Sequence, residues 1–174
     1  MIIESGMTFG PYPDGHYFHI EKSLTYQNIR DHGVRIAEFL LLRFQENKPT
    51  AVWIVEAKSS SPHPITRPNF DSFIREIREK FTNTLSLYLA MHLKRHKDTD
   101  ELPEPFKALN LSTADFRLVL VVNAHKEDWL GHLKDAVVKA LHPVIKTWAL
   151  DPLAVIVLND SMARKCGLVD VGMK

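Results

Sequence analysis

The sequence predicts an α/β domain whose core is a mixed β-sheet of about five strands flanked by α-helices. Two observations support this fold class. Short runs that are apolar and rich in β-branched residues predict strands at residues 17–23, 34–43, 50–59, 116–123 and 153–158. Two longer segments, residues 69–95 and 126–141, repeat apolar residues at helical spacing and lie between the later strands. This order predicts an antiparallel meander followed by crossover strands.

The first part of the chain is dominated by turn residues. Residues 10–15 are GPYPDG, a composition that favours turns over regular structure. We therefore expect residues 1–16 to form a surface arm and residues 17–174 to form a single domain. Residues 17–23 alternate well enough for a first strand, and residues 24–33 predict a connector or a short helix.

The second and third strands are expected to form a hairpin. The loop between them, residues 45–49, contains Asn and Pro, which suit a turn. With this loop Phe44 faces Thr50, and counting back places Glu38 opposite Glu56; a loop one residue shorter or longer would shift the pairing. Both carboxylates share their strand faces with apolar residues of core type: Ile36, Leu40, Leu42, Val52 and Ile54.

The long helix over residues 69–95 is expected to begin at Asn69 or Asp71, which are both suited to a helix N-terminus. Residues 98–115 are polar, contain two prolines and predict a loop. Residues 116–123 form a continuous apolar run, FRLVLVVN, which predicts a central strand covered on both faces.

The last elements are a helix, a strand and a short helix. Pro143 is expected to stop the helix over residues 126–141. Trp129 and Trp148 are expected to be anchors of the core. After the strand at 153–158, Asp160 is the expected N-cap of a short helix over residues 161–165.

Composition excludes several classes of protein. The chain has 174 residues, 45% of them hydrophobic, which suits one globular domain. The 22 basic and 21 acidic residues leave a net charge of +1, so any binding to nucleic acid needs a local patch. Cys166 is the single cysteine, which excludes an internal disulfide and a cysteine-based zinc site. No apolar stretch reaches the length of a membrane span, so we expect a cytoplasmic protein without a membrane partner.

The expected Glu38–Glu56 pair is the candidate functional site of the chain. Directly opposed residues on neighbouring strands have Cβ atoms roughly 5 Å apart, and like charges there are destabilising. A divalent cation bound by carboxylate oxygens would stabilise such a pair. Lys58 projects from the same face as Glu56, because side chains alternate with period two. The alternative is that these residues form only a cluster of cross-strand salt bridges.

The order of these residues and elements resembles the PD-(D/E)xK nuclease superfamily over residues 17–123. A meander carries an acid on its second strand and Glu56-Ala57-Lys58 on its third, followed by a helix and a buried strand. The resemblance implies a restriction-endonuclease-like fold and phosphodiester cleavage with Mg²⁺ or Mn²⁺. It implies that Glu38 and Glu56 bind the metal and that Lys58 positions the attacking water and offsets charge.

The chain departs from the family pattern in three ways. Glu38 stands where aspartate is usual, the "PD" dipeptide is absent, and no helix is predicted before residue 17. The family's first helix often carries a further acid, and Glu21 on the first strand is the candidate to replace it as a metal ligand.

Contacts with nucleic acid are expected around the same site. Ser59 and Ser60 follow Lys58 and could donate hydrogen bonds to a phosphate, although such a run also suits a plain loop. Basic residues along the long helix could follow a phosphate backbone, or could simply form a solvated face with the nearby glutamates: Arg78, Lys80, Lys94, Arg95 and Lys97. Two histidine pairs, His16 with His19 and His92 with His96, are three and four residues apart and offer a zinc site as a further alternative.

The function expected from the sequence is a metal-dependent nuclease acting on DNA more than on RNA. It would work as a homodimer or as the nuclease subunit of a larger bacterial assembly for defence or DNA processing. The rival expectation is an inactive module with the nuclease fold that binds nucleic acid or serves as a scaffold. A third alternative is an unrelated α/β protein in which the Glu-x-Lys motif arose by chance, and in which Glu38 would not lie beside Glu56.

Overall fold

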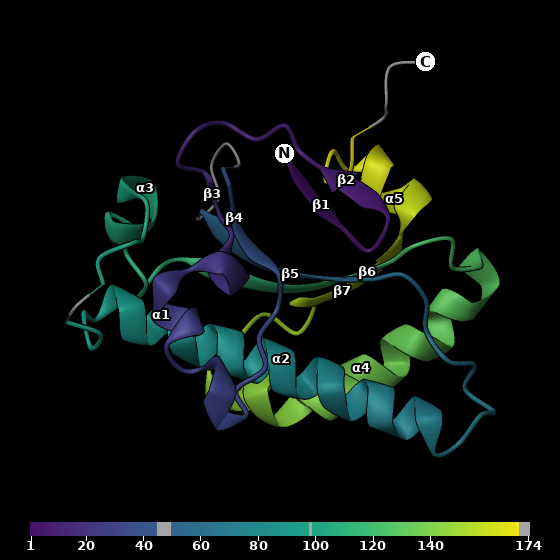
Figure 1. The fold of residues 1–174 in the computed structure, drawn as a ribbon. Helices are drawn as coiled ribbons and strands as arrows, with labels where there is room; N and C mark the ends of the chain where they lie inside the picture. Colours follow the sequence, from purple (N-terminus) through teal and green to yellow (C-terminus); the bar gives the residue numbers. More distant parts are fainter. Residues whose placement is uncertain (45–49, 98, 171–174) are drawn as a thin grey trace.

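A computed structural model of the chain describes residues 1–44, 50–97 and 99–170. Its centre is a five-stranded mixed sheet in the order β3-β4-β5-β6-β7 (Figure 1). The strands are β3 (Tyr17–Phe18), β4 (Phe39–Arg43), β5 (Ala51–Lys58), β6 (Asp115–Val122) and β7 (Val155–Asn159). The first three pair antiparallel and the last three pair parallel, so the predicted meander with crossover strands is confirmed.

Both long helices cover one face of the sheet (Figure 1). They are α2 (Asn69–His92), which connects β5 to β6, and α4 (Glu127–Thr147), which connects β6 to β7. The larger apolar core lies between these helices and the sheet, and it includes Leu40, Ile54 and Leu120 from the strands. Shorter helices lie in the connections: α1 (Leu24–Gln27), α3 (Glu104–Lys107) and two turns of 3-10 helix at Ile20–Lys22 and Arg30–His32.

The opposite face of the sheet is covered by α5 (Asp160–Lys165) and by a hairpin of β1 (Ile2–Glu4) and β2 (Met7–Phe9). The expectation of a surface arm at residues 1–16 is therefore wrong, because Phe9 is completely buried in this second core. The hairpin turns at Ser5 and Gly6, which both have positive φ, as a two-residue turn requires. Asn123 and Ala57 at the ends of β6 and β5 hold this turn through hydrogen bonds.

The register of β4 and β5 agrees with the predicted hairpin. The paired residues run from Phe39 with Val55 to Arg43 with Ala51, so the next position at this end brings Glu38 opposite Glu56. The loop at residues 45–49 lies outside the described residues. The strand is shorter than the predicted 34–43, because the Ala37 N–H donates to Thr84 Oγ1 of α2 at 2.7 Å instead of pairing within the sheet.

Local expectations at the other elements need four corrections. The first strand is only two residues long, because the chain enters a 3-10 helix after His19. Helix α4 passes through Pro143 and ends at Thr147, since burial of Ile145 extends its apolar stripe and outweighs the lost hydrogen bond. Trp129 and Trp148 are 37% and 48% exposed and are not core anchors. The N-cap of α5 is Asn159 rather than Asp160, since the side chain of Asn159 accepts a hydrogen bond from the Met162 N–H.

Candidate active site

The site is built around the carboxyl half of β5 and the residue that precedes β4. Glu56 lies on β5, which pairs with a strand on each side, and its side chain is 0% exposed. It points to the face that carries Val52 and Ile54, which is the face covered by α2. Glu38 is also buried and, one residue before β4, lies directly opposite Glu56 in the register of the two strands. The two carboxylates that the register predicted to be neighbours are thus brought together.

Helix α2 supplies two further charged residues, Glu76 and Lys80, which are one helical turn apart. The Lys80 Nζ lies 2.8 Å from Glu56 Oε1 and 3.7 Å from Glu38 Oε1. The Lys58 Nζ lies 3.2 Å from the same Glu56 oxygen and 2.6 Å from Glu76 Oε1. Acids and lysines therefore alternate across the site in the order Glu76, Lys58, Glu56, Lys80, Glu38. We call these five residues the acid–lysine row.

The electrostatics of the row are dominated by burial. Burial raises the pKa of Glu38 to about 8, helped by a hydrogen bond with Glu21 and by the negative charge of Glu56. Burial also raises the pKa of Glu56, and the neighbouring ammonium groups of Lys80 and Lys58 only partly offset this. For Lys80, burial alone would lower the pKa, but the carboxylates of Glu56, Glu38 and Glu21 together outweigh it and raise the pKa. Lys80 is therefore charged at neutral pH, and Glu38 holds a proton over much of the neutral range.

A second group of ligand-type side chains adjoins Glu38. Glu4 from β1, His19 and Glu21 offer ligand atoms that lie, together with one from Glu38, within 4.8 Å of one another. The His19 Nε2 lies 3.5 Å from Glu4 Oε1, and burial lowers the pKa of this imidazole. We call Glu4, His19, Glu21 and Glu38 the carboxylate–histidine group.

The donors of this group fit a divalent cation. Carboxylate oxygens are the preferred ligands of Mg²⁺ and Mn²⁺, and a neutral imidazole can complete a site for a transition metal. The His19 Nε2 is buried and has no hydrogen-bond partner among the described residues, so a ligand atom is available there. Glu56 Oε2 is likewise buried without a partner in the described part of the chain. Glu38 belongs to both groups, so a cation bound by the carboxylate–histidine group would lie next to the acid–lysine row.

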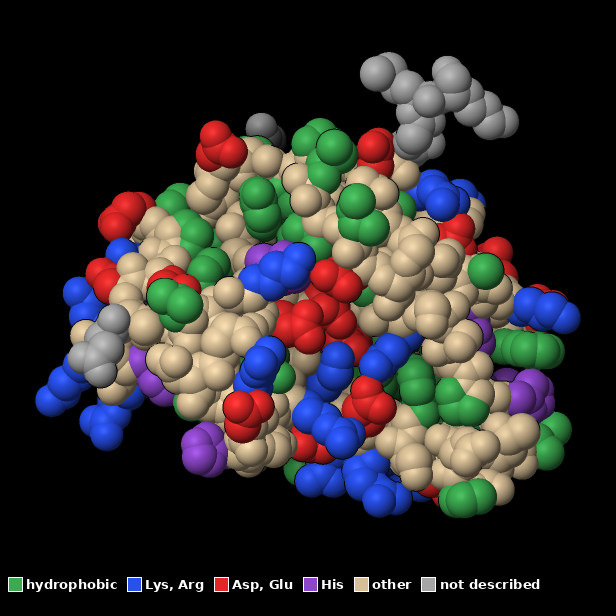
Figure 2. All heavy atoms as spheres, in the orientation of Figure 1, with side chains coloured by type: hydrophobic (Ala, Val, Ile, Leu, Met, Phe, Trp, Pro, Cys, Tyr) green, Lys and Arg blue, Asp and Glu red, His purple; other side chains and the backbone are tan. Residues whose placement is uncertain are grey.

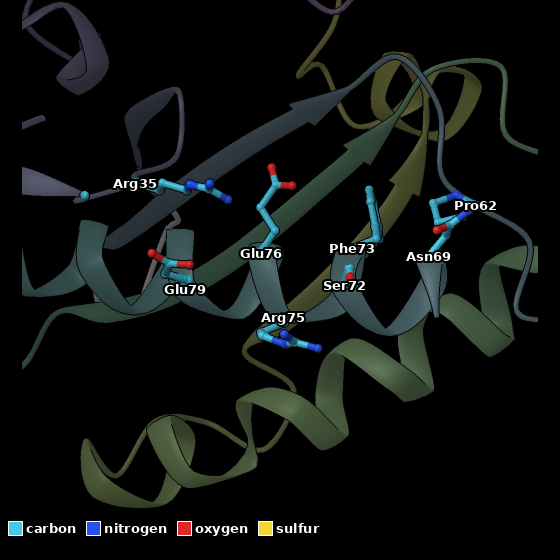
Figure 3. Close-up of a pocket in the computed structure, with 9 residues that line it drawn as sticks. Arg35, Pro62, Asn69, Ser72, Phe73, Arg75, Glu76 and Glu79 are labelled. Carbon is cyan, nitrogen blue, oxygen red and sulfur yellow. The ribbon is translucent and has the colours of Figure 1, made fainter. Parts of the chain in front are cut away.

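The surface around the site is polar. Figure 2 shows acidic side chains gathered in the middle of one face of the molecule, with Lys and Arg side chains beside them. A cleft with a volume of about 660 Å³ opens along the first half of α2 and includes Glu76 in its wall. Figure 3 shows Glu76 rising from α2 on the same side as Phe73, with Arg35 pointing toward it. The Glu76 end of the acid–lysine row is therefore accessible from this cleft.

The expected nucleic-acid contacts fall in three places. Ser59 and Ser60 are exposed directly after Lys58, and Arg78 is exposed on α2. Lys80 was expected on a phosphate-binding face, but its contacts with two buried glutamates show that it belongs to the site itself. The remaining residues, Lys94, Arg95 and Lys97, follow the end of α2 at His92, which is about 18 Å from Lys80 along the helix axis.

Four residues of the site were not found from the sequence in these roles: Glu4, His19, Glu76 and Lys80. Glu76 and Lys80 are four residues apart and flank the core positions Ile77 and Phe81, which is a signal that they border the buried face of α2. Glu4 could not be found because residues 1–16 were expected to form an arm. Within the described part of the chain, the group of ligand-type side chains that the structure brings together joins His19 to carboxylates and includes neither His16 nor the pair His92 and His96.

No family model, curated protein or solved structure matches the chain closely enough to assign it by similarity. Among the described helices, none combines the length and the apolar character needed to cross a membrane. The interpretation of the site therefore depends on its own geometry.

Proposed function

We propose that the chain is a divalent-metal-dependent nuclease that hydrolyses phosphodiester bonds in nucleic acid, with DNA as the first substrate to test. The observation that supports this most is the convergence of Glu56 and Lys58 on β5 with Glu38, the residue that precedes β4. A protein gains little stability from burying several acids at one place, because each buried charge is costly to desolvate. Such a cluster beside a cleft is more typical of a functional site.

In this proposal the carboxylate–histidine group holds Mg²⁺ or Mn²⁺. A bound ion supplies Lewis-acid chemistry, because it polarises a phosphoryl oxygen and lowers the pKa of bound water. Lys58 donates a hydrogen bond to a non-bridging phosphate oxygen and stabilises the charge that develops there. Glu56 and Glu76 hold the Lys58 ammonium in position through contacts of 3.2 and 2.6 Å. In hydrolysis the oxygen of water bonds to phosphorus, the ester P–O bond breaks, and a proton of the water ends on the leaving oxygen.

The test is cleavage of labelled single-stranded and duplex DNA, and of RNA, by the purified chain with Mg²⁺ or Mn²⁺. Glu38→Gln and Lys58→Met should each reduce the cleavage rate by roughly 100-fold or more, in the range reported for loss of one electrostatic group. The matched control for Lys58→Met is Lys165→Met, since Lys165 is exposed on α5, which covers the opposite face of the sheet. Wild-type protein that cleaves no polymer with either ion, or full activity in Glu38→Gln, would refute the proposal.

One observation favours a second candidate, an inactive module that binds nucleic acid or serves as a scaffold. The Lys80 ammonium already lies between Glu38 and Glu56, where it supplies the cation that the two acids need. In that case Mn²⁺ would not raise the melting temperature of the protein. A rise with Mn²⁺ that disappears in His19→Ala and Glu38→Gln would favour the nuclease instead.

A further inference from the structure

The cleft beside Lys58 has a lining suited to one class of ligand. Its walls come from the first half of α2, from Gly33 and Arg35 before β4, and from Pro62 after β5. Phe73 and Glu76 lie on the side of α2 that faces Arg35 and Pro62 (Figure 3). The volume of about 660 Å³ lies within the range of pockets for small ligands, so it suits a nucleotide or two and not a double helix.

The cleft is continuous with the acid–lysine row. Glu76 lines the cleft, and its carboxylate accepts a hydrogen bond from the Lys58 Nζ at 2.6 Å. Burial would raise the pKa of Glu76, but this hydrogen bond and the charges of Lys58, Lys80 and Arg35 outweigh it and lower the pKa. A molecule bound in the cleft would therefore lie directly beside the ammonium group proposed to contact the phosphate.

The chemistry of the walls combines cations, an aromatic ring and neutral polar groups. Arg35 offers a guanidinium group on the side of Phe73 and Glu76, and such groups bind phosphate oxygens in bidentate fashion; Arg75 points away from that side of α2 (Figure 3). Phe73 is half-buried and offers a ring on which a base can stack. Asn69 and Ser72 add hydrogen-bonding groups at the start of α2.

The acids of the cleft do not prevent the approach of a phosphate. Glu76 is paired with Lys58, which leaves Glu79 to oppose Arg35 and Arg75. A neighbouring hollow of about 350 Å³ shares Arg75 and Glu79 with the cleft and adds Arg78. Around the cleft and the hollow, the three arginines thus outnumber Glu79, for which the described part of the chain provides no ion pair.

We propose that the cleft binds an unpaired nucleotide of a single-stranded nucleic acid next to the bond that is cut. The base stacks on Phe73, and Arg35, which points toward Glu76 on the same side of α2, contacts a flanking phosphate. A base held in a duplex cannot reach Phe73, because its faces are covered by its neighbours in the stack. The inference rests on the proposed nuclease function and deepens it by naming the substrate as single-stranded, or as a duplex with a single-stranded extension.

The experiment measures binding by fluorescence anisotropy, with a labelled short oligothymidine and a labelled blunt hairpin duplex. Ca²⁺ replaces Mg²⁺, since it also prefers oxygen ligands, and a gel afterwards confirms that the oligonucleotides are intact. Phe73→Leu should weaken oligothymidine binding by about 5- to 150-fold, the equivalent of one lost stack, and leave hairpin binding unchanged. The matched control is Phe44→Leu, the same change at an exposed phenylalanine that lies against His16.

Arg35→Gln provides a second variant, because Phe73 packs partly against the core and its replacement can affect folding. Loss of one phosphate contact should reduce the slope of log affinity against log salt by about 0.7 for a single strand. The inference is wrong if wild-type protein does not bind oligothymidine, if Phe73→Leu weakens both ligands equally or neither, or if Arg35→Gln leaves the slope unchanged.

These outcomes are separate from those of the nuclease test. Normal oligothymidine binding by Phe73→Leu would overturn the single-strand inference even if DNA is cleaved. Absence of cleavage by the wild type would overturn the nuclease even if Phe73 proves to bind a base.

Discussion

Lys80→Met tests whether the acid–lysine row is held together by its interior cation. The substitution keeps an unbranched side chain of similar length on α2 and removes the ammonium group. Glu38 and Glu56 then face each other across the sheet with no charge between them. Glu56 keeps one ionic partner, Lys58, whereas Glu38 loses the cation whose charge lowers its pKa.

The size of the effect follows from burial. Glu56 is 0% exposed and the Lys80 side chain is 13% exposed, so the pair belongs to the buried class. Removal of one partner from a buried pair costs about 3–5 kcal/mol of unfolding free energy. Because Lys58 still contacts Glu56, we expect the lower end, ~3 kcal/mol at pH 9, where Glu38 is ionised. For a chain of this size that corresponds to a fall in melting temperature of about 6–12 °C.

The assay is urea unfolding of wild type and Lys80→Met in metal-free buffer at pH 9 and pH 6. The cost should be smaller at pH 6 by ~1 kcal/mol or more, because Glu38 takes up a proton there and no longer repels Glu56. Lys97→Met, at an exposed lysine, should cost little at either pH. A cost below about 1 kcal/mol at pH 9, or an equal cost at both pH values, would refute the reasoning.

Three further predictions concern the residues around the row. The pKa of Glu38 is about 8 in the folded protein and near 4.5 in the unfolded chain, so the folded state binds more protons between these pH values. The unfolding free energy of metal-free protein should therefore fall as pH rises from 5 to 8, by at most ~1.4 kcal/mol per pH unit. Glu38→Gln should flatten this pH profile. Thr84→Val should cost about 1–3 kcal/mol in urea unfolding, because it leaves the buried Ala37 N–H without an acceptor; a cost as small as that of Thr82→Val, at a half-buried threonine of the same helix, would contradict this. Phe9→Ala should cost about 3–5 kcal/mol by the same assay, since the hairpin is part of the second core, and a cost below about 1 kcal/mol would show that the hairpin is an arm after all.

The sequence predicted the parts of the fold that depend on local patterns. The hairpin register required only the alternation of side chains and the length of the loop, so the approach of Glu38 to Glu56 could be inferred by counting. The strand order followed from the succession of elements, because parallel strands need long crossover connections.

The parts that were missed depend on contacts between distant segments. The rotation of α2 about its axis decides whether Lys80 points to solvent or to Glu56, and that rotation is set by packing against the sheet. Glu4 joins the site only because the hairpin before β3 packs on the far face of the sheet. The continuation of α4 through Pro143 likewise reflects burial of Ile145, and helix propensity alone does not predict this tertiary contact.

The alternation of charges in the acid–lysine row has a consequence for how the site can change over evolutionary time. Replacing an interior member by a neutral residue brings two like charges next to each other, whereas replacing Glu76 at the end leaves only a lysine that the cleft can hydrate. The row can therefore be shortened from its Glu76 end in one step, but Glu56 and Lys80 can be lost only together. Related chains should then either retain both of these residues or lack both, and a chain that has lost both has also lost the means to hold Lys58 and Glu38 in one site.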